Sequence, residues 1–536
     1  MAEKAGIGAD LSLPGHSECE VNQVDAFMKI RELISLEKHL RSFPETPHGP
    51  IGLIYPHVYP VGMASLGYQQ VYRLFRESGF GVERVFWDPQ GRETISLENR
   101  IPLFRFPIVA SSYTYELDIL HLLKMLIRGG VDPLAEQRGP ESPWLIMGGQ
   151  AATANPRLLQ RIADIIVLGE GEQVIEALSR TLIQTQGEAR TRVLEAVAEL
   201  PHVYVPRVHG EFDRFRFPQH TLEPLDLYPC HSVIRAAEDE FGGAFLLELS
   251  RGCKYQCKFC IVHYMNGTAR YREFDSLIDT LDRYQHLYEK VGLLGAAVAD
   301  HPRVEDVTEW LVRRGKQVST SSLRAERLTE RFLDLLREGG QQNLTVAPEA
   351  GDVTRRRDMK KGVRDDKYLR LAEWAGKRQF HSLKLYFLLG TPGADPMDEA
   401  AEIIEFSRKM SEVFTGHGGG KIIAALSPFV PKPTTPWASE ALWDPKAVKK
   451  ASRVVRKHLA FRGNLKVPPV NVKEARAEAI LSWFGPELTD ELLRLAREEI
   501  SLESAFKDFN LDQIPEQARR ISGHPELAET GGKGMK

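Results

Sequence analysis

The chain has 536 residues, of which 42% are hydrophobic and 27% charged, and its formal net charge is −3 at pH 7. This length exceeds one ordinary hydrophobic core, so we expect two or three domains. The composition is that of a soluble globular protein, and the slightly negative charge argues against a protein that coats nucleic acid. We find no apolar run long enough to span a bilayer and no secretory signal in residues 1–15, so we expect a cytoplasmic protein without a membrane span.

Cysteine usage supports a reducing compartment. Five cysteines are too few and too unevenly spaced for a disulfide framework. Three of them fall within eight residues, at Cys253, Cys257 and Cys260, whereas Cys19 and Cys230 stand far apart. This distribution favours one metal-binding cluster.

The first half of the chain predicts a doubly wound sheet. Residues 1–48 form a polar leader with an amphipathic helix over 24–41. Apolar strands at 51–55, 82–86, 108–112, 144–147 and 165–168 then alternate with helices such as 65–78 and 117–127. This alternation predicts a Rossmann-like domain with a parallel sheet over residues 49–184. A proline-containing linker follows over residues 185–243.

The second half predicts a barrel. Candidate strands lie at 245–250, 293–299, 317–321, 343–347, 382–388 and 422–427, with helices such as 277–290 and 397–414 between them. Six strand–helix units predict a partial (β/α)6 barrel of the TIM type over residues 244–440. Residues 441–536 are charged and predict a helical C-terminal region. The fold class is therefore α/β throughout both main domains.

The three clustered cysteines follow the first predicted barrel strand with the spacing C-x3-C-x2-C. Three thiolates on one loop can each bind one iron of a cubic 4Fe–4S cluster and leave the fourth iron open. A structural zinc site would need four ligands, usually in two pairs, and His263 is the only nearby candidate for the fourth. The position at the carboxyl end of a barrel strand also favours catalysis.

The cysteine motif, with Phe259 before the last cysteine, resembles the signature of the radical SAM superfamily. Residues 344–351, 384–393 and 427–436 resemble the family's fourth, fifth and sixth strands. The resemblance implies that S-adenosylmethionine (SAM) binds the open iron and is cleaved to a 5′-deoxyadenosyl radical, with SAM contacts from Glu349, Arg324 and Tyr386. Glu349 could instead be a barrel carboxylate paired with a lysine or arginine, and Arg324 could be a surface charge. The Gly-Gly-Glu segment after the second strand is absent, and residues 296–302 stand in its place.

The first domain resembles the cobalamin-binding domain that precedes many radical SAM barrels. Small residues at strand ends would let a corrin approach the backbone. The resemblance implies cobalamin contacts from the following residues: Tyr55, His57, Met63, Ser111, Ser112, Gly148, Gly149, Thr153, Gly169 and Glu170. The Asp-x-His-x-x-Gly motif is missing, so we expect cobalt without a protein imidazole; His57 is the candidate if one binds. A sheet that only shapes the substrate pocket is the alternative.

Together these resemblances imply a cobalamin-dependent radical SAM methyltransferase, which moves a methyl group from SAM through methylcobalamin to an unactivated carbon. No catalytic residue is identified. We expect a small-molecule or peptide substrate and an electron donor such as flavodoxin or ferredoxin.

Two alternatives remain. One is a cobalamin-independent radical enzyme that forms carbon–carbon or carbon–sulfur bonds or rearranges its substrate; a methylthiotransferase would need three further N-terminal cysteines. The other is a non-catalytic iron–sulfur sensor. No nucleic-acid module is evident in the sequence. The basic run at residues 355–357 predicts a solvated helix face.

Overall fold

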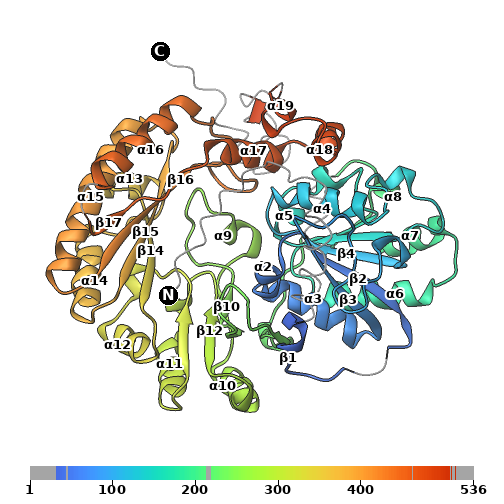
Figure 1. Cartoon of the computed structure of the whole chain (residues 1–536), viewed down its shortest axis with the longest axis horizontal. Helices are drawn as coiled ribbons and strands as arrows, with labels where there is room; N and C mark the ends of the chain where they lie inside the picture. The colour runs from blue at the N-terminus through green and yellow to red at the C-terminus, as the bar shows by residue number, and fades with distance from the viewer. Residues whose placement is uncertain are drawn as a thin grey trace, which may run out of the picture.

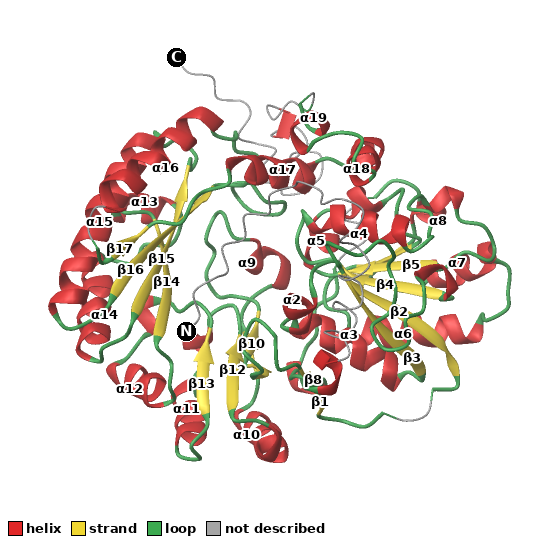
Figure 2. Cartoon of the chain, viewed as in Figure 1, coloured by secondary structure: helices red, strands yellow, loops and turns green. Residues whose placement is uncertain are grey.

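Two α/β units lie side by side in a computed structural model of the chain, and helices from the C-terminal region lie across both (Figure 1). The structure describes residues 32–43, 46–212, 219–460 and 463–507, together with residues 509, 513 and 514. Each unit is built on parallel strands with helices around them (Figure 2). This is the α/β class that the alternation of strands and helices predicts.

The N-terminal unit contains a six-stranded sheet in the order β3-β2-β4-β5-β6-β7. The first five strands are parallel and correspond to the predicted ones, whereas β7 pairs antiparallel with β6. The strands are β2 (His48–Tyr55), β3 (Phe80–Phe86), β4 (Ile108–Ser112), β5 (Trp144–Gly148), β6 (Ile165–Val167) and β7 (Val203–Tyr204). Because β3 and β4 lie on opposite sides of β2, the strand order reverses between β2 and β4, and open α/β sheets bind ligands at such a point.

Both faces of this sheet are buried, as in other parallel sheets. Along β2, Leu53 packs in one core cluster and Ile54 in another. One face is covered by α3 (Leu66–Glu77), α6 (Glu172–Gln184) and α7 (Arg190–Ala198), and the other by α4 (Asp118–Arg128) and α5 (Gln150–Ala154). Burial on both faces explains why the predicted strands are near-continuous apolar runs in the sequence.

The barrel consists of six parallel strands in chain order. They are β9 (Phe245–Glu248), β12 (Lys290–Leu294), β13 (Gln317–Thr320), β14 (Asn343–Glu349), β15 (Ser382–Leu389) and β16 (Lys421–Pro428). A bridge between Leu323 and Val346 joins the first three strands to the last three. The predicted strand at 293–299 is shifted, because β12 ends at Leu294 and a short 3-10 helix occupies Val298–Asp300.

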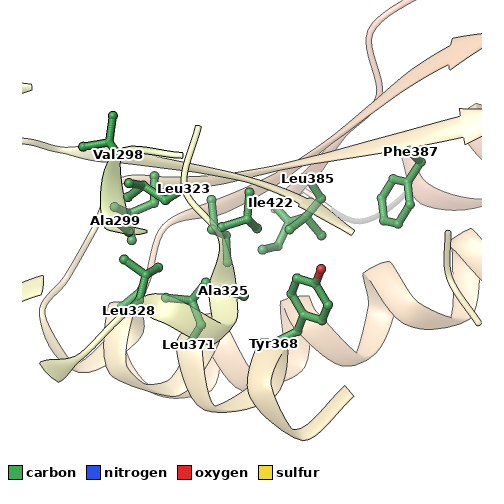
Figure 3. Close-up of a cluster of buried hydrophobic side chains, with 14 of the residues drawn as sticks. Val298, Ala299, Leu323, Ala325, Leu328, Tyr368, Leu371, Leu385, Phe387 and Ile422 are labelled. Carbon is green, nitrogen blue, oxygen red and sulfur yellow. The ribbon is translucent and has the colours of Figure 1, made fainter. Parts of the chain in front are cut away.

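The barrel helices pack apolar faces against these strands. They are α10 (Phe274–Tyr284), α11 (Val304–Val312), α12 (Glu330–Glu338), α14 (Asp365–Lys377), α15 (Pro396–Gly416) and α16 (Pro445–Ala460). Figure 3 shows Leu385 and Phe387 of β15 directed toward Tyr368 and Leu371 of α14, and all four are buried. This alternation along β15 leaves Tyr386 on the opposite, inner face.

Several segments differ from the sequence predictions. The predicted leader helix at 24–41 lies mostly outside the described residues; residues 32–35 are helical, but β1 (Lys38–His39) follows and pairs with β8 (Ile234–Arg235). The edge strand β7 lies within the predicted linker. The basic run at 355–357 is not a solvated face, because Arg356 is fully buried and donates to the carbonyl oxygens of Ala350 and Val363. Within the described ranges, no helix combines the length and apolar character that a membrane crossing requires.

The C-terminal region is helical, as predicted, and it contacts both units. The barrel side includes β17 (Leu465–Lys466), which extends the sheet beside β16. Beyond it, α17 (Val472–Trp483) and α18 (Thr489–Ala496) share a core cluster with α4 of the N-terminal unit. Asn155 donates to the carbonyl oxygens of Leu481 at 2.9 Å and Phe484 at 2.8 Å. These helices therefore hold the two units together.

A buried ion-pair network lies at the same junction. Lys432, on the proline-rich loop after β16, contacts Glu116 of the N-terminal unit and lies 2.7 Å from Glu478 of α17. Burial alone would lower the pKa of Lys432, but the two carboxylates raise it above its usual value. The lysine is therefore charged, and removing it would leave two carboxylates close together with little access to water.

We predict that Lys432→Met lowers the free energy of unfolding by about 3 kcal/mol, because unpaired buried charges are costly. Urea denaturation measures the loss. The control is Lys124→Met, whose partner Glu498 is 63% exposed, and this change should cost less than about 1 kcal/mol. Equal losses in the two variants would contradict a structural role for the Lys432 network.

Candidate functional site

The three clustered cysteines lie on the loop that follows the first barrel strand. After β9, the short strand β10 (Ser250–Arg251) leads into the loop, and Cys260 is the N-cap of α9 (Ile261–Asn266). The loop thus leaves the carboxyl end of β9, where barrel active sites lie. In Figure 1, α9 lies between the barrel strands and the N-terminal unit.

The thiols are shielded from water. Cys257 is buried, and Cys253 and Cys260 are partly buried. Burial raises the pKa of Cys260 to about 11, and the two neighbouring thiols contribute. Burial also raises the pKa of Cys257, although Lys361 and Arg324 act in the opposite direction. These thiols would stay protonated alone, whereas iron binding replaces their protons.

The donor set fits a cluster better than a single ion. Across the described ranges, no three histidine, cysteine or carboxylate side chains come together as ligands for one metal ion. The three thiols are nevertheless close enough to influence one another's ionisation. A cubic iron–sulfur cluster needs one thiolate at each of three irons, which are spread over the cluster. Three thiols on one loop can meet this requirement.

Asp300 holds the cysteine loop, and the sequence did not single it out for this role. Its Oδ1 accepts a hydrogen bond from Tyr255 Oη at 3.1 Å and forms an ion pair with Lys254 Nζ at 2.9 Å. Arg327 contacts the same oxygen at 2.7 Å, while Oδ2 is buried without a partner among the described residues. Asp300 lies in the segment that replaces the Gly-Gly-Glu motif. An acidic residue just past the second barrel strand was the available signal.

Two of the three predicted SAM residues lie close to Cys257. Glu349, at the end of β14, has a φ of 68° and accepts from Lys361 Nζ at 2.8 Å. The guanidinium of Arg324 stacks 3.4 Å from the centre of the Tyr255 ring, within the cysteine loop. Glu349 therefore makes the lysine ion pair that was its alternative interpretation. Arg324 is not a surface charge, because its side chain is only 14% exposed and pairs with Glu326. Tyr386 lies on the inner face of β15, where Lys384 Nζ is 4.6 Å from its ring.

At the edge of the N-terminal sheet, the predicted serines lie where the strand order reverses. Ser111 and Ser112 end β4, next to β2. The Ser111 hydroxyl is buried and has no hydrogen-bond partner among the described residues. Tyr55 ends β2, and its hydroxyl lies 3.3 Å from Thr114 Oγ1. An unsatisfied hydroxyl at this point of an open α/β sheet fits a site for a polar ligand.

The glycines farther along this edge serve the protein's own packing. Gly149 has a φ of 111°, and a Cβ there would lie 2.5 Å from the Tyr113 carbonyl oxygen. Gly169 has a φ of 89°, and a Cβ there would overlap the backbone of His220, which pairs with it. Gly148 comes directly before Gly149. The Thr153 hydroxyl donates to the carbonyl oxygen of Gly149 and accepts from the amide of Gly169, so it links the two glycine segments. Close approach of the chain itself therefore accounts for Gly149 and Gly169.

Two further predicted cobalamin contacts are engaged elsewhere. Met63 is fully buried, and its sulfur accepts from Arg84 at 3.4 Å, within the core behind the sheet edge. Glu170 pairs with Arg251 and Arg270 of the barrel, so its carboxylate joins the two units. The sequence could not separate these uses, because a small or polar residue at a strand end suits either a ligand or another segment.

A histidine pair links the loop after β2 to α4, and the sequence analysis named only one of the two residues, His57. His57 Nδ1 accepts from the amide of Val58 at 2.9 Å. Its ring lies 5.9 Å from that of His121, which stacks on Trp87 at 4.8 Å. Burial lowers the pKa of His57 and lowers that of His121 to about 4. Nearby, burial and Glu116 raise the pKa of Asp118 to about 7. In the sequence, only their spacing of one helical turn connects His121 with Asp118.

Ion pairs bind the cysteine loop to the N-terminal unit. Arg251, two residues before Cys253, contacts Glu172 at 2.6 Å and Glu170 at 3.4 Å, just past β6. Glu248, at the end of β9, contacts Arg251 at 2.8 Å. The carboxyl ends of the first barrel strand and of a strand of the N-terminal sheet therefore face each other.

Comparison with known proteins agrees with this arrangement. The family model "Radical SAM proteins, N-terminal" matches residues 67–206, and the model "Radical SAM superfamily" matches residues 247–406. An uncharacterised protein of Methanocaldococcus jannaschii is 24% identical over 86% of this chain and 94% of its own length. The ribosomal protein uS12 methylthiotransferase RimO of Solibacter usitatus is 23% identical over 35% of this chain and 44% of its own.

A solved structure has a similar fold over most of this chain. The radical S-adenosylmethionine methyltransferase TsrM from Kitasatospora setae, with cobalamin and a 4Fe–4S cluster bound, is similar with a TM-score of 0.55 and 13% identity. The match covers 85% of this chain and 100% of that one. The two family models together match more than half of the chain, and the cysteine motif lies at the barrel mouth. This chain is therefore an enzyme of the radical SAM superfamily.

Proposed function

We propose that the protein is a cobalamin-dependent radical SAM methyltransferase, which moves a methyl group from SAM to an unactivated carbon of its substrate. One observation carries this proposal. The carboxyl ends of the N-terminal sheet and of the barrel face the same junction, and the cysteine loop lies there. A ligand at the reversal point of the sheet would therefore face a ligand at the barrel mouth. The TsrM structure, which contains cobalamin and a cluster, supports this assignment.

In this proposal the barrel holds the cluster and SAM. Cys253, Cys257 and Cys260 would bind three irons, and Arg324 and Lys361 would offset the negative charge beside Cys257. When bound, the cluster supplies the electron that cleaves SAM. The buried and unpartnered Oδ2 of Asp300 is available to accept a hydrogen bond from a cationic group at the barrel mouth. Glu349 at the end of β14, Arg324 on the loop after β13 and Tyr386 within β15 are the proposed SAM contacts.

We predict that replacing Cys253, Cys257 and Cys260 together with alanine abolishes iron binding and SAM cleavage, because no other described thiols share this spacing. Anaerobic reconstitution followed by iron analysis and an absorption spectrum measures the loss. Cys19→Ala and Cys230→Ala are the controls and should leave both properties intact, since burial raises the pKa of Cys230 to about 12. An unchanged cluster spectrum in the triple variant would disprove the assignment.

Cobalamin is proposed at the reversal point of the N-terminal sheet. Ser111 offers a buried hydroxyl without a partner among the described residues. Tyr55 and Ser112 end the two adjacent strands, and His57 follows β2. When bound, cobalamin would supply the methyl-carrying cobalt. The Nδ1 of His57 already accepts from the Val58 amide, which fits cobalt without a protein imidazole. Gly148, Gly149 and Thr153 would shape the wall of the site, whereas Met63, Gly169 and Glu170 are not proposed as contacts.

We predict that the protein reconstituted with excess cobalamin retains about one corrin per chain after desalting, and that Ser111→Val weakens corrin binding about tenfold through a lost hydrogen bond and added bulk. Equilibrium dialysis measures the affinity. Ser179→Val is the matched control, because Ser179 is a buried serine on α6 whose hydroxyl has no partner in the described part of the chain. His57→Ala should leave the corrin spectrum unchanged. Retention of no corrin would overturn this part of the proposal and favour a cobalamin-independent radical enzyme.

The methylthiotransferase alternative gains little support from the chain. The two methylthio-transferring relatives, RimO and a tRNA-2-methylthio-N(6)-dimethylallyladenosine synthase, align with only 35% and 28% of this chain. Of the two cysteines outside the motif, Cys230 is buried and Cys19 lies outside the described residues. We propose a small-molecule or peptide substrate and reduction of the cluster by a flavodoxin or ferredoxin in the cytoplasm.

A further inference from the structure

The outer surface of α16 carries a continuous basic face that the reaction does not use. Six cationic side chains on this helix are exposed: Lys446, Lys449, Lys450, Arg453, Arg456 and Lys457. Five of them line a shallow groove of about 340 Å³ together with Val454. The positions 446, 449, 450, 453 and 457 recur at helical spacing, so they form one stripe about 16 Å long. We call this stripe the α16 basic face.

The basic residues of this segment are not interspersed with acidic ones. The 29 residues between Asp444 and Glu474 contain nine lysines and arginines and no acidic residue. Because the whole chain has a net charge of −3, the remainder carries −12. Among the described residues, no carboxylate lies within ion-pair distance of the six exposed cations of α16, whereas exposed cations elsewhere in the barrel are commonly paired. A solvated helix face ordinarily mixes both signs.

The arrangement is also unfavourable for the isolated helix. The first turn of α16 contains no acidic residue, and lysines stand near the positive end of the helix dipole. Like charges at positions three and four apart repel each other. The helix is stabilised instead by its apolar face, where Val448, Val455 and Leu459 are fully buried in the barrel core. The exposed charge therefore makes no apparent contribution to folding.

We propose that the α16 basic face binds the phosphate backbone of a nucleic acid. Lysines and arginines in a regular row neutralise phosphates without reading sequence. A protein partner fits less well, because protein interfaces favour aromatic residues, methionine and arginine and are depleted in lysine. A membrane helix would need an exposed apolar face, and that of α16 is buried. The helix α16 packs against α15 on the outer side of the barrel, away from the cysteine loop. It would therefore tether the protein without entering the reaction.

The test is binding of the full chain to a fluorescein-labelled single-stranded RNA of about 16 nucleotides, followed by anisotropy over a series of KCl concentrations. Six phosphate contacts predict a slope of log K against log salt of about −4. The variant K446Q/K449Q/K450Q/K457Q should weaken binding at least about tenfold at low salt and reduce the slope by about 3. Its thermal midpoint should stay equal or rise, because repulsion is removed.

The matched control is R313Q/R331Q/K377Q/K409Q, which removes the same charge from exposed side chains that already have carboxylate partners. It should bind the RNA within about twofold of the unmodified protein. Equal weakening in both variants would mean that net charge alone attracts RNA and would overturn the proposal. Absence of RNA binding would overturn it too, as would preferential α16-dependent binding to phosphatidylserine vesicles. Cluster content and SAM cleavage should be unchanged in the α16 variant, so this outcome is independent of the methyltransferase assignment.

Discussion

The structure depends on charged contacts between two sheets whose carboxyl ends face each other. Apolar packing of α17 and α18 brings the units together but tolerates small rotations, because hydrophobic contact is non-directional. The pairs of Lys432 with Glu116 and of Arg251 with Glu172 are directional, and both are largely buried. Buried ion pairs add little net stability, yet breaking one partner is costly. We infer that these pairs define one relative orientation of the two units.

This orientation has a direct consequence for the chemistry. Arg251 is two residues from the first cysteine, and Lys432 lies on the loop whose Trp437 packs against Phe259, 6.4 Å between ring centres. The amide of Trp437 also donates to the carbonyl oxygen of Lys258 at 3.1 Å. Thus both ion pairs act on segments that contact the cysteine loop. A change in the contact between the two units would move the cysteine loop relative to the edge of the N-terminal sheet. A reaction between groups bound on the two units would be sensitive to such a displacement.

The fold and the position of the cysteine loop were predictable from the sequence because their signals are local. Buried parallel strands are apolar runs, and ligands on one loop show their spacing directly. The predicted cobalamin contacts stay predictions, because the same residue type can serve either a ligand or the packing of the chain. Gly169 is small so that the His220 segment can approach, and Glu170 is acidic because Arg251 and Arg270 face it. Those partners are 50 to 100 residues away along the chain, and only the tertiary structure brings them together. Asp300 escaped notice for the same reason, since its role depends on Tyr255 and Arg327.

Two basic segments show why the spacing of charges matters more than their number. Arg355, Arg356 and Arg357 are consecutive, so their side chains point about 100° apart around the helix. One of them had to face the core, and Arg356 does so by donating to backbone carbonyls. Lys446, Lys450 and Lys457 recur at helical spacing and share one side of α16, where nothing in the described structure neutralises them. The net charge of the chain conceals this separation, because the excess of acidic residues elsewhere cancels it. A basic stripe becomes a candidate binding surface only when its opposite, apolar side is accounted for by the core.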